Sequence, residues 1–171
     1  FNPDTTTVAA LIPVRLDPAI ELGLQKHLLG LAIGSAQAAS VVQHVYVTTD
    51  HDGLAEYAES CGAKILKRSE PLNQASVAEV LRYALSQIED TETQFLDYVV
   101  TLEITHPFRP QDIVQRCVEK ALNTGLACVV AGVPEYRPCW YLEQGEYRRI
   151  DDFLHQRTQR EPVHVGLPAL C

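Results

Sequence analysis

Short apolar segments alternate with amphipathic ones along this chain, and the alternation limits its fold more than any other feature. Strands are predicted for the apolar or β-branched runs at residues 8–14, 44–49, 64–66, 98–102 and 127–133, of which the first and the last two are expected to be buried. Helices are predicted for the intervening residues 31–39, 53–61, 76–88 and 110–122, with an irregular connection over 16–30. Such alternation predicts a three-layer, Rossmann-like α/β fold with a mostly parallel sheet and helices on both faces.

Several helix ends carry local signals. Asp50 or Asp52 is expected to cap the helix over 53–61, and Gly62 fits just past its end. Ser76, followed three residues later by Glu79, forms the pattern of a capping box.

The last predicted helix and the residues that follow it complete the pattern. Pro110 is expected to open the last helix, since its missing N–H falls where no partner exists. Beyond residue 134 the pattern weakens, and only residues 147–150 are expected to form an edge strand.

Composition narrows the class of protein. We expect one globular domain over residues 1–171, and the net charge of −8 argues against nucleic-acid binding. No apolar run reaches the roughly 18 residues of a membrane span, and no signal peptide is visible, so we expect a cytoplasmic protein without a membrane partner. The five cysteines show no Cys-x-x-Cys spacing and are expected to be reduced.

The segment YVVTLEITHPFR, residues 98–109, is the most informative about function. Its apolar start reads as a buried strand, which must stop near His106 because Pro107 lacks a backbone N–H. Ligands of open parallel sheets bind at the carboxyl ends of strands. This segment therefore places Glu103, Thr105, His106 and Arg109 at a candidate binding edge.

Taken in order, these segments resemble the acylneuraminate cytidylyltransferase family, enzymes that activate nine-carbon sugar acids. Residues 11–15, LIPVR, are similar to that family's Ile-Pro-Ala-Arg opening, and residues 45–50, VYVTTD, to its Val-Val-Val-Ser-Thr-Asp. Residues 102–109, LEITHPFR, are similar to its Leu-Gln-Pro-Thr-Ser-Pro-Leu-Arg, and residues 138–140 to its Ser-Pro-x-Trp segment. The resemblance covers about residues 8–142 and implies a fold of the nucleotide-diphospho-sugar transferase type.

The resemblance implies that CTP loses pyrophosphate while the anomeric oxygen of a sialic-acid-like sugar acid attacks its α-phosphate. Such a transfer needs positioning and charge neutralisation more than covalent help. A Mg²⁺ cofactor with unknown ligands and a homodimer are also implied. The implied residues are Arg15 and Lys26 for catalysis, Arg15, Arg68, Ser76 and Asp50 for the nucleotide, and Glu103, Thr105, His106 and Arg109 for the substrate.

Most of these residues also have an ordinary structural interpretation. Ser76 and Asp50 would serve as helix caps, and Arg68 as a solvated loop residue. His106 would be a structural or surface histidine, and Arg109 would hold its loop through backbone carbonyls.

The sequence also departs from the family pattern. Residues 16–26, LDPAIELGLQK, stand where the family has a Gly-Ser-Lys-Gly loop, and Glu103 replaces a glutamine, so its carboxylate would repel an acidic substrate. The chain stops at Cys171, before the family's magnesium-binding acidic residues.

These departures leave several hypotheses open. One is a catalytically inactive nucleotide- or partner-binding domain of the same fold. Another is that residues are missing from the sequence, as the shortened loops and the complete absence of methionine indicate. An unrelated dinucleotide-binding domain is disfavoured because no Gly-x-Gly-x-x-Gly follows the first strand.

Overall fold

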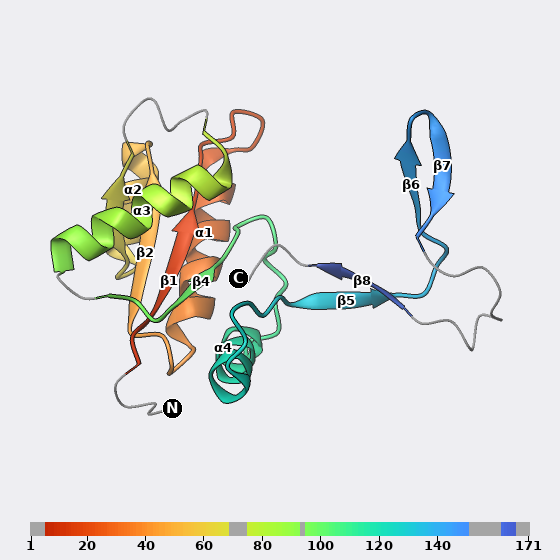
Figure 1. The fold of residues 1–171 in the computed structure, drawn as a ribbon. Coiled ribbons are helices and arrows are strands. Elements are labelled where there is room, and N and C mark those ends of the chain that lie inside the picture. The colour runs from red at the N-terminus through yellow and green to blue at the C-terminus, as the bar shows by residue number, and fades with distance from the viewer. Residues whose placement is uncertain (1–5, 69–74, 93–94, 151–161, 167–171) are drawn as a thin grey trace. The chain divides into compact units, whose positions relative to one another are not determined.

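Four parallel strands form the central sheet of the computed structural model, which describes residues 6–68, 75–92, 95–150 and 162–166 (Figure 1). Their order is β3-β2-β1-β4. The strands are β1 (Val8–Pro13), β2 (His44–Thr49), β3 (Lys64–Lys67) and β4 (Tyr98–Thr101). The chain moves outward from β1 to β3 and then returns to the other side of β1, so the direction of winding reverses between β1 and β4. Such a reversal is the usual place for a ligand in this class of sheet.

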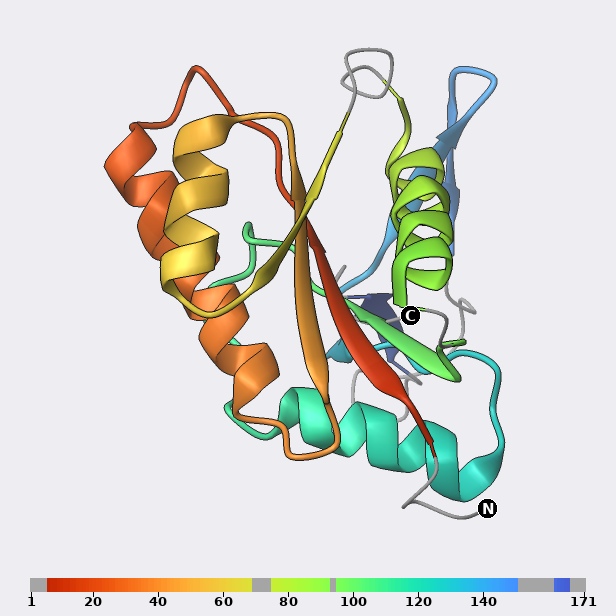
Figure 2. The same ribbon diagram turned by 90° about the vertical axis from the view of Figure 1, so that its left-hand side faces the viewer.

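Four helices cover this sheet: α1 (Leu22–Gln37), α2 (Asp52–Ser60), α3 (Val77–Glu92) and α4 (Ile113–Thr124). Figure 2 shows α1 and α2 on one face and α3 on the other. The predicted three-layer, mostly parallel α/β fold is confirmed.

Alternating residues of β1 face opposite layers of the fold. Ala9 and Leu11 join a buried cluster with Tyr46 of β2 and with Ala84 and Ile88 of α3. Every residue of Val8–Pro13 is buried except Pro13. The central strand is therefore covered on both faces, which explains its continuous apolar run.

Helix α1 begins at Leu22, whereas the sequence predicted an irregular chain up to residue 30. Gly23 and Gly30 lower the helix propensity of this segment and hide its start. The helix is nevertheless specified by a stripe of buried side chains at helical spacing, namely Gln25, Leu29, Ala32, Ile33 and Ala36.

The predicted cap of α2 is wrong. His51 occupies the N-cap position, and its Nδ1 accepts a hydrogen bond from the backbone N–H of Leu54 at 3.3 Å. The two candidate carboxylates are engaged by cations instead, Asp52 by Lys67 at 3.1 Å and Asp50 by Arg68 at 3.2 Å. The predicted stop of this helix is supported, because Gly62 has a φ of +84° that favours glycine.

The last helix also starts later than predicted. Pro110 precedes α4, and its carbonyl accepts a hydrogen bond from the N–H of Ile113 at 3.1 Å. The helix ends on Gly125 in the left-handed conformation.

Helix α3 begins with the predicted capping box. The backbone N–H and Oγ of Ser76 donate to Glu79 Oε2 at 2.8 and 2.7 Å, and the N–H of Glu79 donates back to Ser76 Oγ at 3.3 Å. The hydrogen bonds from Ser76 lower the pKa of Glu79 below its ordinary value.

This shift gives a pH dependence of known sign. Because the pKa is depressed in the folded state, the stabilisation by Glu79 is present above the unfolded pKa and is lost as the pH falls through the folded one. A carboxyl-detected NMR titration should place the Glu79 midpoint below the ordinary value of a glutamate. The Ser76→Ala variant should bring the midpoint back toward the ordinary value, and an unchanged midpoint would contradict the assigned capping box.

A second compact unit spans Ala131–Leu167 and is described by itself. Strand β5 (Gly132–Glu135) pairs antiparallel with β8 (Val163–Gly166), and β6 (Trp140–Glu143) pairs with β7 (Glu146–Arg149). The latter hairpin turns through Gln144 and Gly145 at φ values of +52° and +87°, as a two-residue turn of type I′ requires.

The predicted buried parallel strand over residues 127–133 is therefore wrong, since strand pairing begins only at Gly132 and is antiparallel. Its apolar run indicated burial, yet Val130 and Val133 are about half exposed, at 52% and 51%. The predicted edge strand over 147–150 corresponds to β7, paired in a hairpin outside the main sheet.

Within the described ranges, no helix has the length and apolar character that crossing a membrane would require. The described cysteines are free thiols at positions 61, 117, 128 and 139, and Cys171 lies outside the described residues.

Candidate functional site

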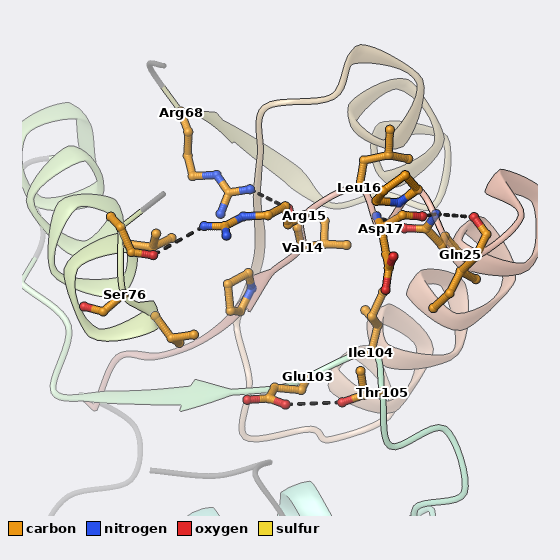
Figure 3. A pocket seen from close by; sticks show the side chains of 16 residues that line it. Val14, Arg15, Leu16, Asp17, Gln25, Arg68, Ser76, Glu103, Ile104 and Thr105 are labelled. Atoms are coloured by element: carbon orange, nitrogen blue, oxygen red, sulfur yellow. Dashed lines mark hydrogen bonds between the residues drawn. The ribbon is translucent and has the colours of Figure 1, made fainter. Parts of the chain in front are cut away.

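A cleft of about 640 Å³ opens at the carboxyl ends of β1 and β4, where the winding of the sheet reverses (Figure 3). Five parts of the chain line it: the end of β1 with the residues after it, Gln25 of α1, Arg68 after β3, the start of α3, and the chain that follows β4. The residues that line it are Pro13, Val14, Arg15, Leu16, Asp17, Pro18, Ile20, Gln25, Arg68, Ala75, Ser76, Val77, Val80, Glu103, Ile104 and Thr105. The structure thus brings Arg15 and the segment from Glu103 to Thr105 into one cavity.

Two guanidinium groups reach the cleft from the ends of β1 and β3. Arg15 is exposed, and its Nη2 donates to the carbonyl of Ala75 at 3.3 Å. Arg68 lies beside it, with its side chain only 2% exposed (Figure 3). The guanidinium pair forms an electropositive wall that suits an anion such as a phosphate.

Arg68 is held in place by two partners. Its Nη2 donates to the carbonyl of Val14 at 2.7 Å and to Asp50 Oδ1 at 3.2 Å. Burial lowers the pKa of Arg68, Asp50 opposes that effect, and the charge of Arg15 adds to it. The Nε of Arg68 is buried without a hydrogen-bond partner among the described residues. This arrangement answers the sequence-based alternative: Arg68 is a buried residue and not a solvated loop residue.

The chain that follows Arg15 is held by Gln25, a residue that the sequence interpretation did not single out. Gln25 is 1% exposed, and its amide makes three hydrogen bonds to this loop. Oε1 accepts from the N–H of Asp17 at 2.9 Å, while Nε2 donates to the carbonyls of Asp17 at 2.9 Å and Ile20 at 2.8 Å. The signal that could have revealed Gln25 is its place in the buried stripe of α1.

The β4 side of the cleft carries Glu103 and Thr105. The hydroxyl of Thr105 donates to Glu103 Oε2 at 3.2 Å and lies 3.1 Å from His106 Nδ1. Arg109 donates through Nη2 to the backbone carbonyl of Glu103. Burial lowers the pKa of Arg109, and the charge of Glu103 opposes this effect.

Four of the implied site residues do not line the cleft. Asp50 stands behind Arg68, and Lys26 lies with its Nζ 6.0 Å from the ring centre of Tyr57. His106 and Arg109 contact the cleft only through Thr105 and Glu103. Arg109 thus holds its loop through a backbone carbonyl, as its structural interpretation had it.

The residues of the cleft do not provide a ready metal site. In the described ranges, no group of three or more His, Cys, Asp or Glu side chains is arranged to hold a metal ion. Asp17 and Glu103 line the cleft, and each already accepts a hydrogen bond, from the N–H of Ala19 and from Thr105. These two carboxylates alone do not make a site that fits the implied Mg²⁺.

Known proteins resemble this chain in sequence and in fold. The chain is 35% identical over 159 residues to the N-acylneuraminate cytidylyltransferase of Escherichia coli O18:K1:H7 (strain RS218 / NMEC), a match that covers 86% of this chain and 35% of that protein. Over most of its own length, this chain is similar to an acylneuraminate cytidylyltransferase. It spans about a third of the length of that relative. A comparison with models of protein families finds no match.

Solved structures confirm the cytidylyltransferase type of fold. The crystal structure of 4-diphosphocytidyl-2C-methyl-D-erythritol synthase superposes with a TM-score of 0.66 at 16% identity, over 95% of this chain and 74% of that one. The synthetase of CMP-2-keto-3-deoxy-manno-octonic acid, solved in complex with CTP, gives a TM-score of 0.62 at 16% identity, over 94% of this chain and 72% of that one. At such identities the likeness concerns the fold alone.

Proposed function

We propose that this acylneuraminate cytidylyltransferase relative binds CTP in the cleft between β1 and β4 and transfers its cytidylyl group to a sialic-acid-like sugar acid. Pyrophosphate is the second product. The observation that carries the proposal is the pair of guanidiniums, Arg15 and Arg68, on one wall of a cleft whose opposite wall is the polar end of β4.

The guanidinium wall would receive the phosphates. Asp50 is the carboxylate that pairs with Arg68, and it is not among the residues that line the cleft, whereas both arginines are. A guanidinium holds phosphate oxygens at two points and stabilises charge that moves to the leaving pyrophosphate. Ser76 adds a hydroxyl at the start of α3, where helix N–H groups also favour an anion.

The β4 wall would receive the sugar. Glu103 and Thr105 present a carboxylate and a hydroxyl, groups that suit the hydroxyl-rich surface of a sugar. Two relatives by fold have names that point to other sugar-like products, so the identity of the sugar acid is the finer part of this proposal.

A pyrophosphate-release assay tests the proposal. Purified full-length chain would be supplied with CTP, Mg²⁺ and either a sialic acid or 2-keto-3-deoxy-manno-octonic acid. We expect pyrophosphate release that requires both the nucleotide and one of the sugar acids, with ATP as the control nucleotide. No release with either sugar acid would contradict the proposed activity.

A non-catalytic nucleotide-binding domain is the second candidate. It is favoured by one observation: none of the described residues that line the cleft is a lysine, and Lys26 lies against Tyr57 instead. Calorimetry separates the two candidates, because saturable CTP binding without turnover would select the second one.

The Mg²⁺ requirement stays a prediction from the family resemblance. When bound to a triphosphate, the ion neutralises charge on the phosphate oxygens. Addition of EDTA to the same assay tests the requirement.

Homodimerisation is also part of the proposal. The hairpin β6–β7 exposes several large apolar side chains, with Leu142 at 62% and Tyr147 at 74%. Exposed apolar groups gathered in this way often mark a contact surface. Sedimentation equilibrium of the full chain tests for a dimer.

A further inference from the structure

We propose that Glu103 is the general base that accepts the proton of the attacking sugar hydroxyl, an inference that rests on the proposed function. In the family that this chain resembles, a glutamine occupies the corresponding position. An amide cannot take up this proton, whereas the carboxylate of Glu103 can.

The position of Glu103 meets the first requirement for such a base. It is the second residue after β4, and it lines the same cleft as the guanidiniums of Arg15 and Arg68 (Figure 3). A phosphate held by those arginines and a sugar resting on the end of β4 would meet between the two walls. A general base must lie within hydrogen-bond reach of the proton that it removes.

The partners of Glu103 meet the second requirement. Its carboxylate accepts one hydrogen bond, from the hydroxyl of Thr105 at 3.2 Å, and forms no ion pair with the described residues. The other nearby carboxylates are engaged differently, Asp50 by the guanidinium of Arg68 and Asp17 by the N–H of Ala19. A carboxylate bound to a cation is a weaker base, since the cation stabilises its charged form. Asp17 follows Arg15 on the β1 side of the cleft, so Glu103 is the carboxylate that lines the β4 wall, where the sugar would lie.

Thr105 and Arg109 act as positioning residues for this base. The hydroxyl of Thr105 has one proton, which it donates to Glu103. His106 Nδ1 lies 3.1 Å from the hydroxyl oxygen of Thr105, so a hydrogen bond between these two atoms requires His106 to be the donor. Arg109 donates to the backbone carbonyl of Glu103 and forms no ion pair with its carboxylate. The side chain of Glu103 is thus oriented by two contacts, neither of which neutralises it.

The chemical step balances without a further reactant. The sugar hydroxyl oxygen forms a bond to the α-phosphorus of CTP, and the bond between that phosphorus and the bridging oxygen breaks. Its electron pair leaves with pyrophosphate. The hydroxyl proton passes to a carboxylate oxygen of Glu103 and from there to solvent, which restores the base for the next turnover.

The Glu103→Gln variant tests this proposal, because it changes only the ability to accept a proton and restores the amide of the resembling family. We expect kcat to fall on the order of 10²-fold or more, in the range usual for loss of a general base. The Kd of CTP, measured by calorimetry, should change by no more than about twofold, since the phosphates contact the other wall. The acidic limb of the pH profile of kcat should be present in the wild type and absent from Glu103→Gln.

Two further variants complete the test. Glu89→Gln makes the same chemical change on the exposed surface of α3 and should leave kcat and the pH profile unaltered. Thr105→Val removes the hydroxyl donor and should displace the acidic limb of the profile without abolishing it.

The outcomes separate this inference from the proposed function. Pyrophosphate release by the wild type together with an unchanged kcat, or an unchanged acidic limb, in Glu103→Gln would overturn the role of Glu103 alone. Absence of pyrophosphate release by the wild type would overturn both.

Discussion

Replacement of Arg68 by methionine is expected to lower the free energy of unfolding by about 2–3 kcal/mol and to weaken CTP binding. The side chain of Arg68 is 2% exposed and bridges the carbonyl of Val14 and the carboxylate of Asp50. Methionine fills similar space but leaves both acceptors without this donor. Asp50 is 23% exposed and regains some water, so the loss should stay below that of a fully buried pair.

Urea unfolding followed by circular dichroism measures the first effect, and calorimetry with CTP measures the second. Arg116→Met is the matched control, because Arg116 pairs with Asp112 on the surface of α4 at 3.6 Å with 65% of its side chain exposed. Such a pair contributes about 0.5 kcal/mol or less. Equal destabilisation by the two variants would show that the buried contacts of Arg68 are not the cause.

Replacement of Gln25 by leucine is expected to destabilise the fold by about 2–3 kcal/mol and to loosen one wall of the cleft. The Gln25 amide uses its oxygen and both N–H groups on the backbone of residues 17–20. Leucine has a similar size and keeps the buried stripe of α1, but it leaves one N–H and two carbonyls without this partner. A buried N–H or carbonyl left without a partner lowers the free energy of unfolding by more than the net contribution of the hydrogen bond that it formed.

Amide hydrogen exchange gives the most direct measurement for this variant. The N–H of Asp17, which donates to Gln25 Oε1, should exchange faster in Gln25→Leu, while amides within β1 and β2 should change only through the lowered global stability. Gln37→Leu is the control on the same helix, since exposed Gln37 makes one hydrogen bond, to the carbonyl of Cys61 at 2.8 Å. Unchanged exchange at Asp17 would mean that the loop keeps its conformation without Gln25.

The parallel sheet could be predicted because most of its strands have clear patterns, whereas the order of the strands was not predicted. Val8–Pro13 is covered on both faces, so its run of apolar residues has no other reasonable interpretation. The start of α1 could not be predicted in the same way, because its glycines lower helix propensity and only packing against the sheet compensates. The segment over 127–133 failed for the opposite reason: its apolar run indicated a strand but carried no information about its partner.

The site shows a similar division between pattern and tertiary contact. The joining of Arg15 with Glu103 in one cleft followed from the rule that parallel strands end at the same edge. Lys26 lies against Tyr57 and Asp50 pairs with Arg68, and neither lines the cleft. These placements depend on side-chain contacts between distant segments. The role of Gln25 was hidden because a buried glutamine and a solvated one look alike in a sequence.

The two walls of the cleft belong to strands that share one hydrogen-bonded ladder, with Val8–Leu11 of β1 directly paired to Tyr98–Thr101 of β4. A compound that bridges these walls must be released before the ladder can melt, so its binding raises the temperature at which the whole sheet unfolds. At a concentration one hundred times its Kd, such a compound adds about 2.7 kcal/mol to stability. Candidate sugars and nucleotides can therefore be ranked by dye-monitored heating alone, before any turnover has been detected.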